Sequence, residues 1–142
     1  MKDFPEQEIW LAHRVSYGET DAMGMVYHAE YLHYFERSRS EFIRELGGMS
    51  YRTMEEKGIA LPVREARCRY RRPARYDELI HIRAGLSEWG RASMTFVYEI
   101  YDEQKETVLA EGMTEHACVD ASSGRPVRMP SWVRDLFEKR QE

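Results

Sequence analysis

The stretch YGETDAMGMVYHAEYLHYFERSR, residues 17–39, decides the fold class and contains the candidate site. Its first part predicts a loop over residues 18–27, punctuated by glycine and carrying Asp21. From residue 28 to 46, apolar residues recur at the period of a helix, and the pair that begins with Gly47 provides a stop signal. The stretch therefore predicts a carboxylate in a structured loop directly before a long amphipathic helix.

Asp21 and His28 are the candidate catalytic residues. His28 stands at the predicted start of the helix, where unpaired backbone N–H groups and the positive end of the helix dipole can polarise a carbonyl oxygen. A carboxylate at Asp21 can attack that carbonyl carbon or activate a water molecule. The pair therefore favours acyl-transfer chemistry that needs no metal.

Strand patterns flank this helix on both sides. We expect strands over residues 8–17, 61–72, 79–88, 92–102 and 107–119. Ser50 caps a short second helix that runs through Lys57, a closing helix covers residues 130–139, and Gly112 marks a bulge in the last strand. One strand, a long helix and four further strands make an α+β domain, with the helix against a curled antiparallel sheet.

Composition places the chain among ordinary globular proteins. Hydrophobic residues make up 42% and charged residues 32%, which favours a single domain over residues 1–142. The absence of a long apolar run predicts a cytoplasmic protein without a transmembrane segment, and the net charge of −4 argues against general nucleic-acid binding. Cys68 and Cys118 lack metal-ligand spacing, so we expect buried reduced thiols and no metal site.

The motif of residues 17–39, together with YRRPARYD at residues 70–77, resembles the hotdog-fold acyl-CoA thioesterases. The similarity is to the 4-hydroxybenzoyl-CoA thioesterase family and its Tol-Pal-associated branch. The matching positions are Tyr17, Thr20, Asp21, Gly24, Val26, His28, Tyr31, Leu32, Phe35 and Glu36. A departure is Glu30, where several relatives carry Asn.

The resemblance implies a long central helix wrapped by a curled five-stranded antiparallel sheet. It also implies hydrolysis of an acyl-CoA to a free carboxylic acid and coenzyme A, with coenzyme A as part of the substrate and no other cofactor. Asp21 then acts as a nucleophile or as a general base, and the His28 backbone N–H polarises the thioester carbonyl. Tyr17 shapes the same site, and Gly24 belongs to the substrate-binding set.

Arginines supply candidate contacts to the phosphates of coenzyme A, because guanidinium groups match phosphate oxygens in geometry and charge. Those assigned to substrate binding are Arg71, Arg72, Arg75, Arg125 and Arg128.

Other side chains receive structural interpretations. Glu36 is a rival catalytic carboxylate on the helix, but an exposed intrahelical pair with Arg39 is the favoured reading of that residue. Without ligand spacing, structural roles are expected for His13, His33, His81 and His116. Aromatic side chains at helical or strand spacing are assigned to the core rather than to an acyl tunnel, namely Tyr31, Tyr34, Phe35, Phe42 and Phe96.

Open sheet edges and the family resemblance imply a homodimer or homotetramer whose sheets join edge to edge, with active sites at the subunit interface. Two rival functions stay open. One is a hotdog hydratase or dehydratase acting on acyl thioesters, and the other is a non-catalytic acyl-CoA-binding protein. The length and type of the acyl group, and the choice between coenzyme A and acyl carrier protein, are also open.

Overall fold

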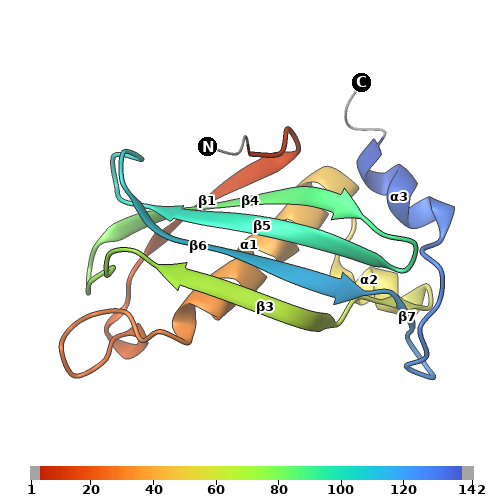
Figure 1. Ribbon diagram of the computed structural model, residues 1–142, viewed down its shortest axis with the longest axis horizontal. Coiled ribbons are helices and arrows are strands. Elements are labelled where there is room, and N and C mark those ends of the chain that lie inside the picture. Colours follow the sequence, from red (N-terminus) through yellow and green to blue (C-terminus); the bar gives the residue numbers. More distant parts are fainter. Residues whose placement is uncertain (1–3, 139–142) are drawn as a thin grey trace.

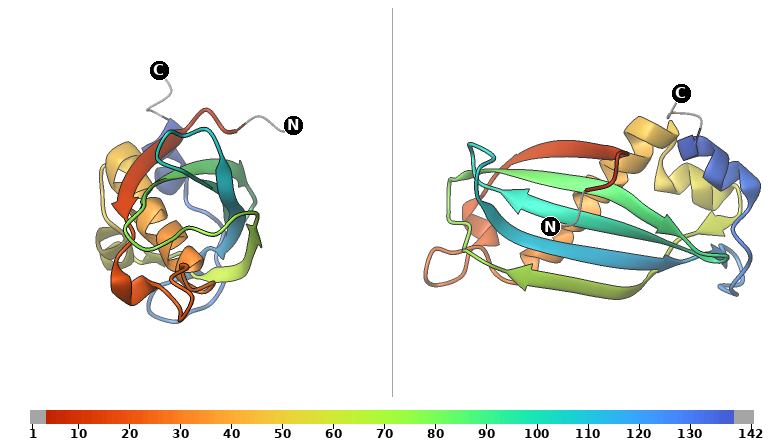
Figure 2. Two further views of the ribbon diagram at one scale, coloured as in Figure 1. Left: turned by 90° about the vertical axis from the view of Figure 1, so that its left-hand side faces the viewer. Right: turned by 45° about the horizontal axis from the view of Figure 1, so that its top comes forward.

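A curled antiparallel sheet wraps around one long helix, as the computed structural model of residues 4–138 shows (Figure 1). The sheet has five strands in the order β1-β4-β5-β6-β3. Their bounds are β1 (Glu8–Arg14), β3 (Val63–Tyr70), β4 (Leu79–Trp89), β5 (Ser93–Tyr101) and β6 (Val108–Ala117). The helix α1 (Glu30–Gly47) runs through the inside of the curl (Figure 2). The predicted α+β architecture is therefore confirmed.

Shorter elements complete the chain. They are η1 (Tyr17–Glu19), α2 (Tyr51–Glu56), β2 (Ile59–Ala60), β7 (Val119–Asp120) and α3 (Ser131–Glu138). The Ser50 side chain accepts a hydrogen bond from Thr53 N, so the predicted cap of α2 is confirmed. The pairing of β2 with β7 was not predicted, because two-residue strands are too short to show a period. Within residues 4–138, none of the helices is long and apolar enough to cross a membrane.

Element boundaries differ from the sequence prediction around the motif loop. β1 ends at Arg14 rather than at residue 17, because Ser16 forms a capping box with Glu19 and the chain turns into the 3₁₀ helix η1. α1 begins at Glu30 rather than at His28, since residues 28 and 29 form a turn before the first helical residue. β3 is likewise shorter than predicted, and position 139 of the closing helix lies outside the described residues.

Gly112 does not mark a bulge. It pairs in register with Cys68 on one side and Tyr98 on the other. A Cβ atom at this position would overlap the Phe35 ring and lie 2.5 Å from the carbonyl oxygen of Arg67. Glycine is needed here because α1 lies so close to the sheet, whereas the irregularities of the ladder occur elsewhere, for example between Leu86 and Glu88.

The buried face of α1 forms the centre of the core. Phe35 stacks on Tyr98 with ring centroids 4.4 Å apart, and Phe42 meets Phe96 edge-on at 5.2 Å. All five aromatic residues assigned to the core from the sequence are buried, which confirms that prediction. At the C-terminal end of α1, Phe137 of α3 packs against Phe42 and closes the core.

Arg39 is buried, so the predicted exposed pair with Glu36 is wrong. Only 6% of Arg39 is exposed, and its guanidinium donates to the hydroxyls of Tyr51 (2.9 Å) and Tyr98 (3.1 Å). Arg39 follows Phe35 by four residues and therefore shares its inward face, whereas Glu36 points to solvent. Although Glu36 and Arg39 are three residues apart, the first is exposed and the second is buried, so they form no ion pair.

A chain of hydrogen bonds continues from Arg39 through the core. The Tyr98 hydroxyl lies 2.6 Å from Thr114 Oγ1, which lies 2.8 Å from His116 Nε2. His116 Nδ1 lies 2.9 Å from the carbonyl oxygen of Leu61, so Nδ1 carries the proton and Nε2 accepts. Burial, reinforced by the Arg39 charge, lowers the pKa of His116 to about 4. His116 therefore has a structural role, as predicted.

The two cysteines are free thiols, as the sequence predicted. Cys118 is buried and Cys68 is partly buried on β3. Burial raises the pKa of both thiols, which keeps them in the protonated form near neutral pH.

Candidate active site

The Asp21 carboxylate organises the loop that carries it. Its Oδ1 accepts hydrogen bonds from the backbone N–H groups of Met23 (2.8 Å) and Met25 (3.2 Å). Gly24 donates to the Asp21 carbonyl oxygen and has a φ of +77°, a conformation that favours glycine. Within residues 4–138, Asp21 Oδ2 accepts no hydrogen bond. One carboxylate oxygen therefore shapes the turn while the other is free.

The two sequence segments that carry the family resemblance lie side by side. Val26 N donates to the carbonyl oxygen of Ala74 (2.8 Å), and Tyr76 N donates to that of Gly24 (3.0 Å). Met25 and Arg75 form the bridge between these two contacts. The Asp21 loop is thus held against the segment that follows β3.

The entrance of α1 presents an unpaired backbone donor. Ala29 is the N-cap and supplies no side-chain cap, while the carbonyl oxygen of Tyr27 accepts from Glu30 N (2.9 Å). The Tyr70 hydroxyl donates to the carbonyl oxygen of His28 (2.8 Å), which holds the peptide group between His28 and Ala29 in place. Among the hydrogen bonds of residues 4–138, none uses the His28 N–H as donor. This N–H is free to meet a carbonyl oxygen.

A pocket of about 280 Å³ brings the acid and the helix entrance together. Its lining residues are Asp21, Met25, Val26, His28, Tyr31, Tyr70, Arg71, Arg72 and Pro73. The Tyr31 and Tyr70 rings meet edge-on at 5.0 Å. Burial raises the pKa of Tyr31 and takes that of Tyr70 to about 12, so both phenols stay neutral near pH 7. The pocket lining thus combines two tyrosines with Asp21, His28 and two arginines.

The predicted site residues differ in their position relative to this pocket. Asp21, His28, Arg71 and Arg72 line the pocket, and Gly24 lies in the loop beside it. Tyr17 is not among the lining residues. The residue is 79% exposed, and its ring meets the Tyr76 ring edge-on at 5.7 Å.

The predicted phosphate-binding arginines are spread over both ends of the molecule. Arg71 is engaged with Glu111 (2.8 Å), whereas the other four form no ion pair within residues 4–138. Arg75 is exposed beside the Asp21 loop. Arg125 and Arg128 follow β7, at the opposite end of the sheet from that loop (Figure 1). The chain therefore does not gather all five around this pocket.

The rival carboxylate Glu36 does not line this pocket. It faces a separate depression of about 200 Å³ between β1 and α1, together with Leu11, Arg37, Ser40 and Glu41. Within residues 4–138 there is also no cluster of three or more His, Cys, Asp or Glu side chains arranged to hold a metal.

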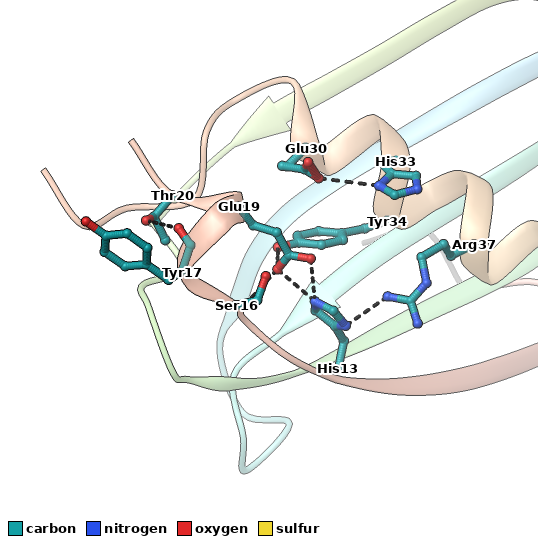
Figure 3. A network of polar contacts seen from close by, with 9 residues as sticks. All are labelled: His13, Ser16, Tyr17, Glu19, Thr20, Glu30, His33, Tyr34 and Arg37. Carbon is teal, nitrogen blue, oxygen red and sulfur yellow. Dashed lines mark hydrogen bonds and ion pairs between the residues drawn. The ribbon is translucent and has the colours of Figure 1, made fainter. Parts of the chain in front are cut away.

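A polar network around Glu19, two residues before Asp21, was missed by sequence reasoning (Figure 3). Glu19 Oε1 accepts from His13 Nε2 (2.9 Å), from the Tyr34 hydroxyl (3.0 Å) and from Ser16 N (3.0 Å). Burial opposes ionisation of Glu19, but these hydrogen bonds outweigh it and hold the pKa of the carboxyl below its ordinary value. The Ser-x-x-Glu spacing of residues 16–19 is a capping-box signal that could have indicated Glu19.

Residues 15–137 match the thioesterase-like superfamily. The chain belongs to this family and is a thioester hydrolase. It is 35% identical to the acyl-CoA thioesterase YbgC of Haemophilus influenzae, over 87% of this chain and 90% of that protein. It is 33% identical to the acyl-CoA thioester hydrolase YbgC of Escherichia coli O6:H1, over 89% of this chain and 92% of that protein.

Solved structures agree with this assignment. The DHNA-CoA thioesterase of Staphylococcus aureus superposes with a TM-score of 0.84 at 30% identity, covering 94% of this chain and 91% of that chain. A 1,4-dihydroxy-2-naphthoyl-CoA thioesterase from Synechocystis gives a TM-score of 0.85 at 17% identity, covering 95% and 98%, and shows the shared fold. The predicted hotdog fold is confirmed.

Proposed function

We propose that this thioester hydrolase cleaves acyl-CoA thioesters to a free carboxylic acid and coenzyme A. The observation that supports it best is the pocket lined by both Asp21 and His28, whose backbone N–H donates no hydrogen bond within residues 4–138. The two relatives named as acyl-CoA thioesterases or thioester hydrolases point to the same substrate class.

The chemistry follows from the two free groups. The thioester oxygen accepts from the His28 N–H, which stabilises the negative charge that develops on it. In the nucleophilic route, Asp21 Oδ2 attacks the carbonyl carbon, the C–S bond breaks, coenzyme A leaves as the thiolate, and water then hydrolyses the mixed anhydride. In the general-base route, Asp21 removes a proton from the water that attacks the thioester directly. Both routes release one acid and one thiol for each water consumed.

Guanidinium groups on the rim hold the phosphates of coenzyme A. Arg72 is the best-placed donor, because it lines the pocket and forms no ion pair within residues 4–138. Arg71 and Arg75 lie close to it in the sequence, although Arg71 forms an ion pair with Glu111. Arg125 and Arg128 are too far along the sheet to serve the same pocket, so their contribution goes to the site of a neighbouring subunit.

A homodimer that joins β3 to β3 explains the open side of the pocket. Within the described residues β3 pairs with β6 alone, and its other edge is free. Ala66 and Tyr70, which alternate onto the inner face of β3, are exposed. Exposed large apolar side chains also gather around the Asp21 loop, at Tyr17, Met23, Tyr27 and Tyr76. Sedimentation should give a dimer or a tetramer, and a fully active monomer would contradict this assembly.

The proposed function is tested by Asp21→Asn. The amide keeps an oxygen in the place of Oδ1 for the two loop hydrogen bonds, so the thermal unfolding temperature should not change. Turnover should fall about a thousandfold, since the nucleophile or base is removed. Thiol release from acyl-CoAs of graded chain length measures the rate, and Asp135→Asn, an exposed change on α3, is the matched control.

The same assay separates the rival functions. A hydratase or dehydratase would change enoyl absorbance without releasing thiol, and a non-catalytic binding protein would retain acyl-CoA without turnover. Either outcome, or unimpaired hydrolysis by Asp21→Asn, would contradict the proposal.

A further inference from the structure

Glu19 closes the loop that carries both halves of the candidate site. Its carbonyl oxygen accepts from Tyr27 N (2.9 Å), and its own N–H donates to Ser16 O (3.0 Å). Asp21 follows Glu19 by two residues, and His28 follows Tyr27 by one. A single backbone contact at Glu19 therefore links the carboxylate to the helix entrance.

The Glu19 side chain also connects the loop to β1 and to α1. Its carboxylate accepts hydrogen bonds from His13 on β1 and from Tyr34 on α1 (Figure 3). Only 18% of the Glu19 side chain is exposed, and Tyr34 is fully buried. The carboxylate thus acts as a fixed point between strand and helix, and it is not among the residues that line the pocket.

Arg37 determines which nitrogen of His13 faces Glu19. Arg37 Nη1 donates to His13 Nδ1 (2.8 Å), so Nδ1 is the accepting nitrogen and Nε2 carries the proton toward Glu19. Arg37 lies three residues after Tyr34 on α1, and its donor completes a chain from the helix through β1 to the loop. Each hydrogen bond in this series therefore has a defined donor and a defined acceptor.

We infer that Glu19 is a positioning residue, whose carboxylate, held by His13 and Tyr34, fixes Asp21 relative to the His28 N–H. This inference rests on the proposed function. Glu19 does not touch the substrate, so its loss misaligns the reacting groups and lowers kcat while leaving substrate binding nearly intact.

The test compares Glu19→Ala with the conservative variant Glu19→Gln. Glu19→Ala should lower kcat about a hundredfold and change KM by less than about threefold. Glu19→Gln keeps an oxygen for the Ser16, Tyr34 and His13 donors, and kcat should stay within about fivefold of wild type. Glu41→Ala, which removes an exposed carboxylate paired with Arg44 on the same helix, is the matched control and should leave both constants unchanged.

A double variant shows whether Glu19 acts through Asp21. In the Asp21→Asn background, Glu19→Ala should cause less than about a threefold further loss of the residual rate, because the group that it positions is already gone. If Glu19→Ala does not fold, Tyr34→Phe removes one of the three hydrogen bonds without a change of volume. It should lower kcat about fivefold at constant KM.

The outcomes separate the two claims. Wild-type kcat in folded Glu19→Ala, with Asp21→Asn impaired, would overturn the positioning role and leave the proposed function standing. A rise in KM equal to the loss of kcat/KM would also overturn it. An enzyme that releases no thiol, or an unimpaired Asp21→Asn variant, would instead overturn the proposed function.

Discussion

The two ends of α1 differ in how completely the chain covers them. At its C-terminal end, α3 packs Phe137 against Phe42 and the core is closed. At its N-terminal end, Asp21 and His28 are exposed, and large apolar side chains such as Met23 face solvent. The closed end is packed around aromatic side chains, whereas the open end exposes the groups on which the proposed function rests.

Hydrogen bonding shows the same contrast. The chain from Arg39 to His116 pairs its polar atoms within the protein, and within residues 4–138 no buried side-chain N or O atom lacks a partner. At the open end, Asp21 Oδ2, the His28 N–H and the Arg72 guanidinium have no such partner in the described chain. Free groups concentrated at one end are those that a substrate can satisfy.

The largest effect on stability is expected from Gly112→Ala. The new methyl group would collide with the Phe35 ring and with a strand carbonyl, which should lower the free energy of unfolding by about 3 kcal/mol or more. Gly18→Ala at the open end is the matched control, because its Cβ would meet nothing within 4 Å. Urea denaturation measures both variants. Equal stabilities would show that the close approach of α1 to the sheet does not require glycine at position 112.

A pH dependence of stability is expected from His116. The unfolded chain binds a proton at this residue below its ordinary pKa of 6.5, whereas the folded protein stays unprotonated there until about pH 4. The unfolded state therefore binds more protons in this window, and the unfolding free energy should fall by up to about 3 kcal/mol as the pH drops from 6.5 to 4.

His116→Gln isolates this contribution, because glutamine can keep a donor and an acceptor but does not titrate. The pH profile of its unfolding free energy should be flatter than that of the wild type by the same amount. Parallel profiles would show that His116 does not couple folding to protons.

The smallest effect is expected from Arg72→Ala at the rim of the pocket. Loss of one charge-assisted contact to a phosphate should raise KM for acyl-CoA about tenfold, with kcat and the unfolding temperature unchanged. Arg52→Ala on the exposed surface of α2 is the matched control. An equal rise of KM in both variants would indicate a general effect of charge and not a local contact.

Sequence reasoning predicted the elements better than their ends. The helical period from residue 28 to 46 located α1, and the motif spacing placed Asp21 and His28 at one pocket. Local sequence patterns gave a wrong prediction, or none, where contacts between separate elements determine the role of a side chain. Arg39 was predicted to be exposed because of its charge, although its spacing of four residues from Phe35 places it on the buried face of the helix. Glu19 was missed because its partners His13 and Tyr34 come from separate elements.

The arginines show a further limit. Arg71 and Arg72 follow a strand that ends beside the Asp21 loop, so sequence proximity to the family motif predicted their place. Arg125 and Arg128 were selected by charge alone, and charge carries no information about the end of the sheet at which a residue lies. Their assignment to a neighbouring subunit depends on an assembly that one chain does not contain.

The unequal use of the two Asp21 oxygens has a consequence for turnover. Oδ1 anchors the turn through Met23 and Met25, so acylation at Oδ2 would leave both anchors in place. The loop would then keep its shape through a covalent intermediate, and no refolding step would separate one catalytic cycle from the next.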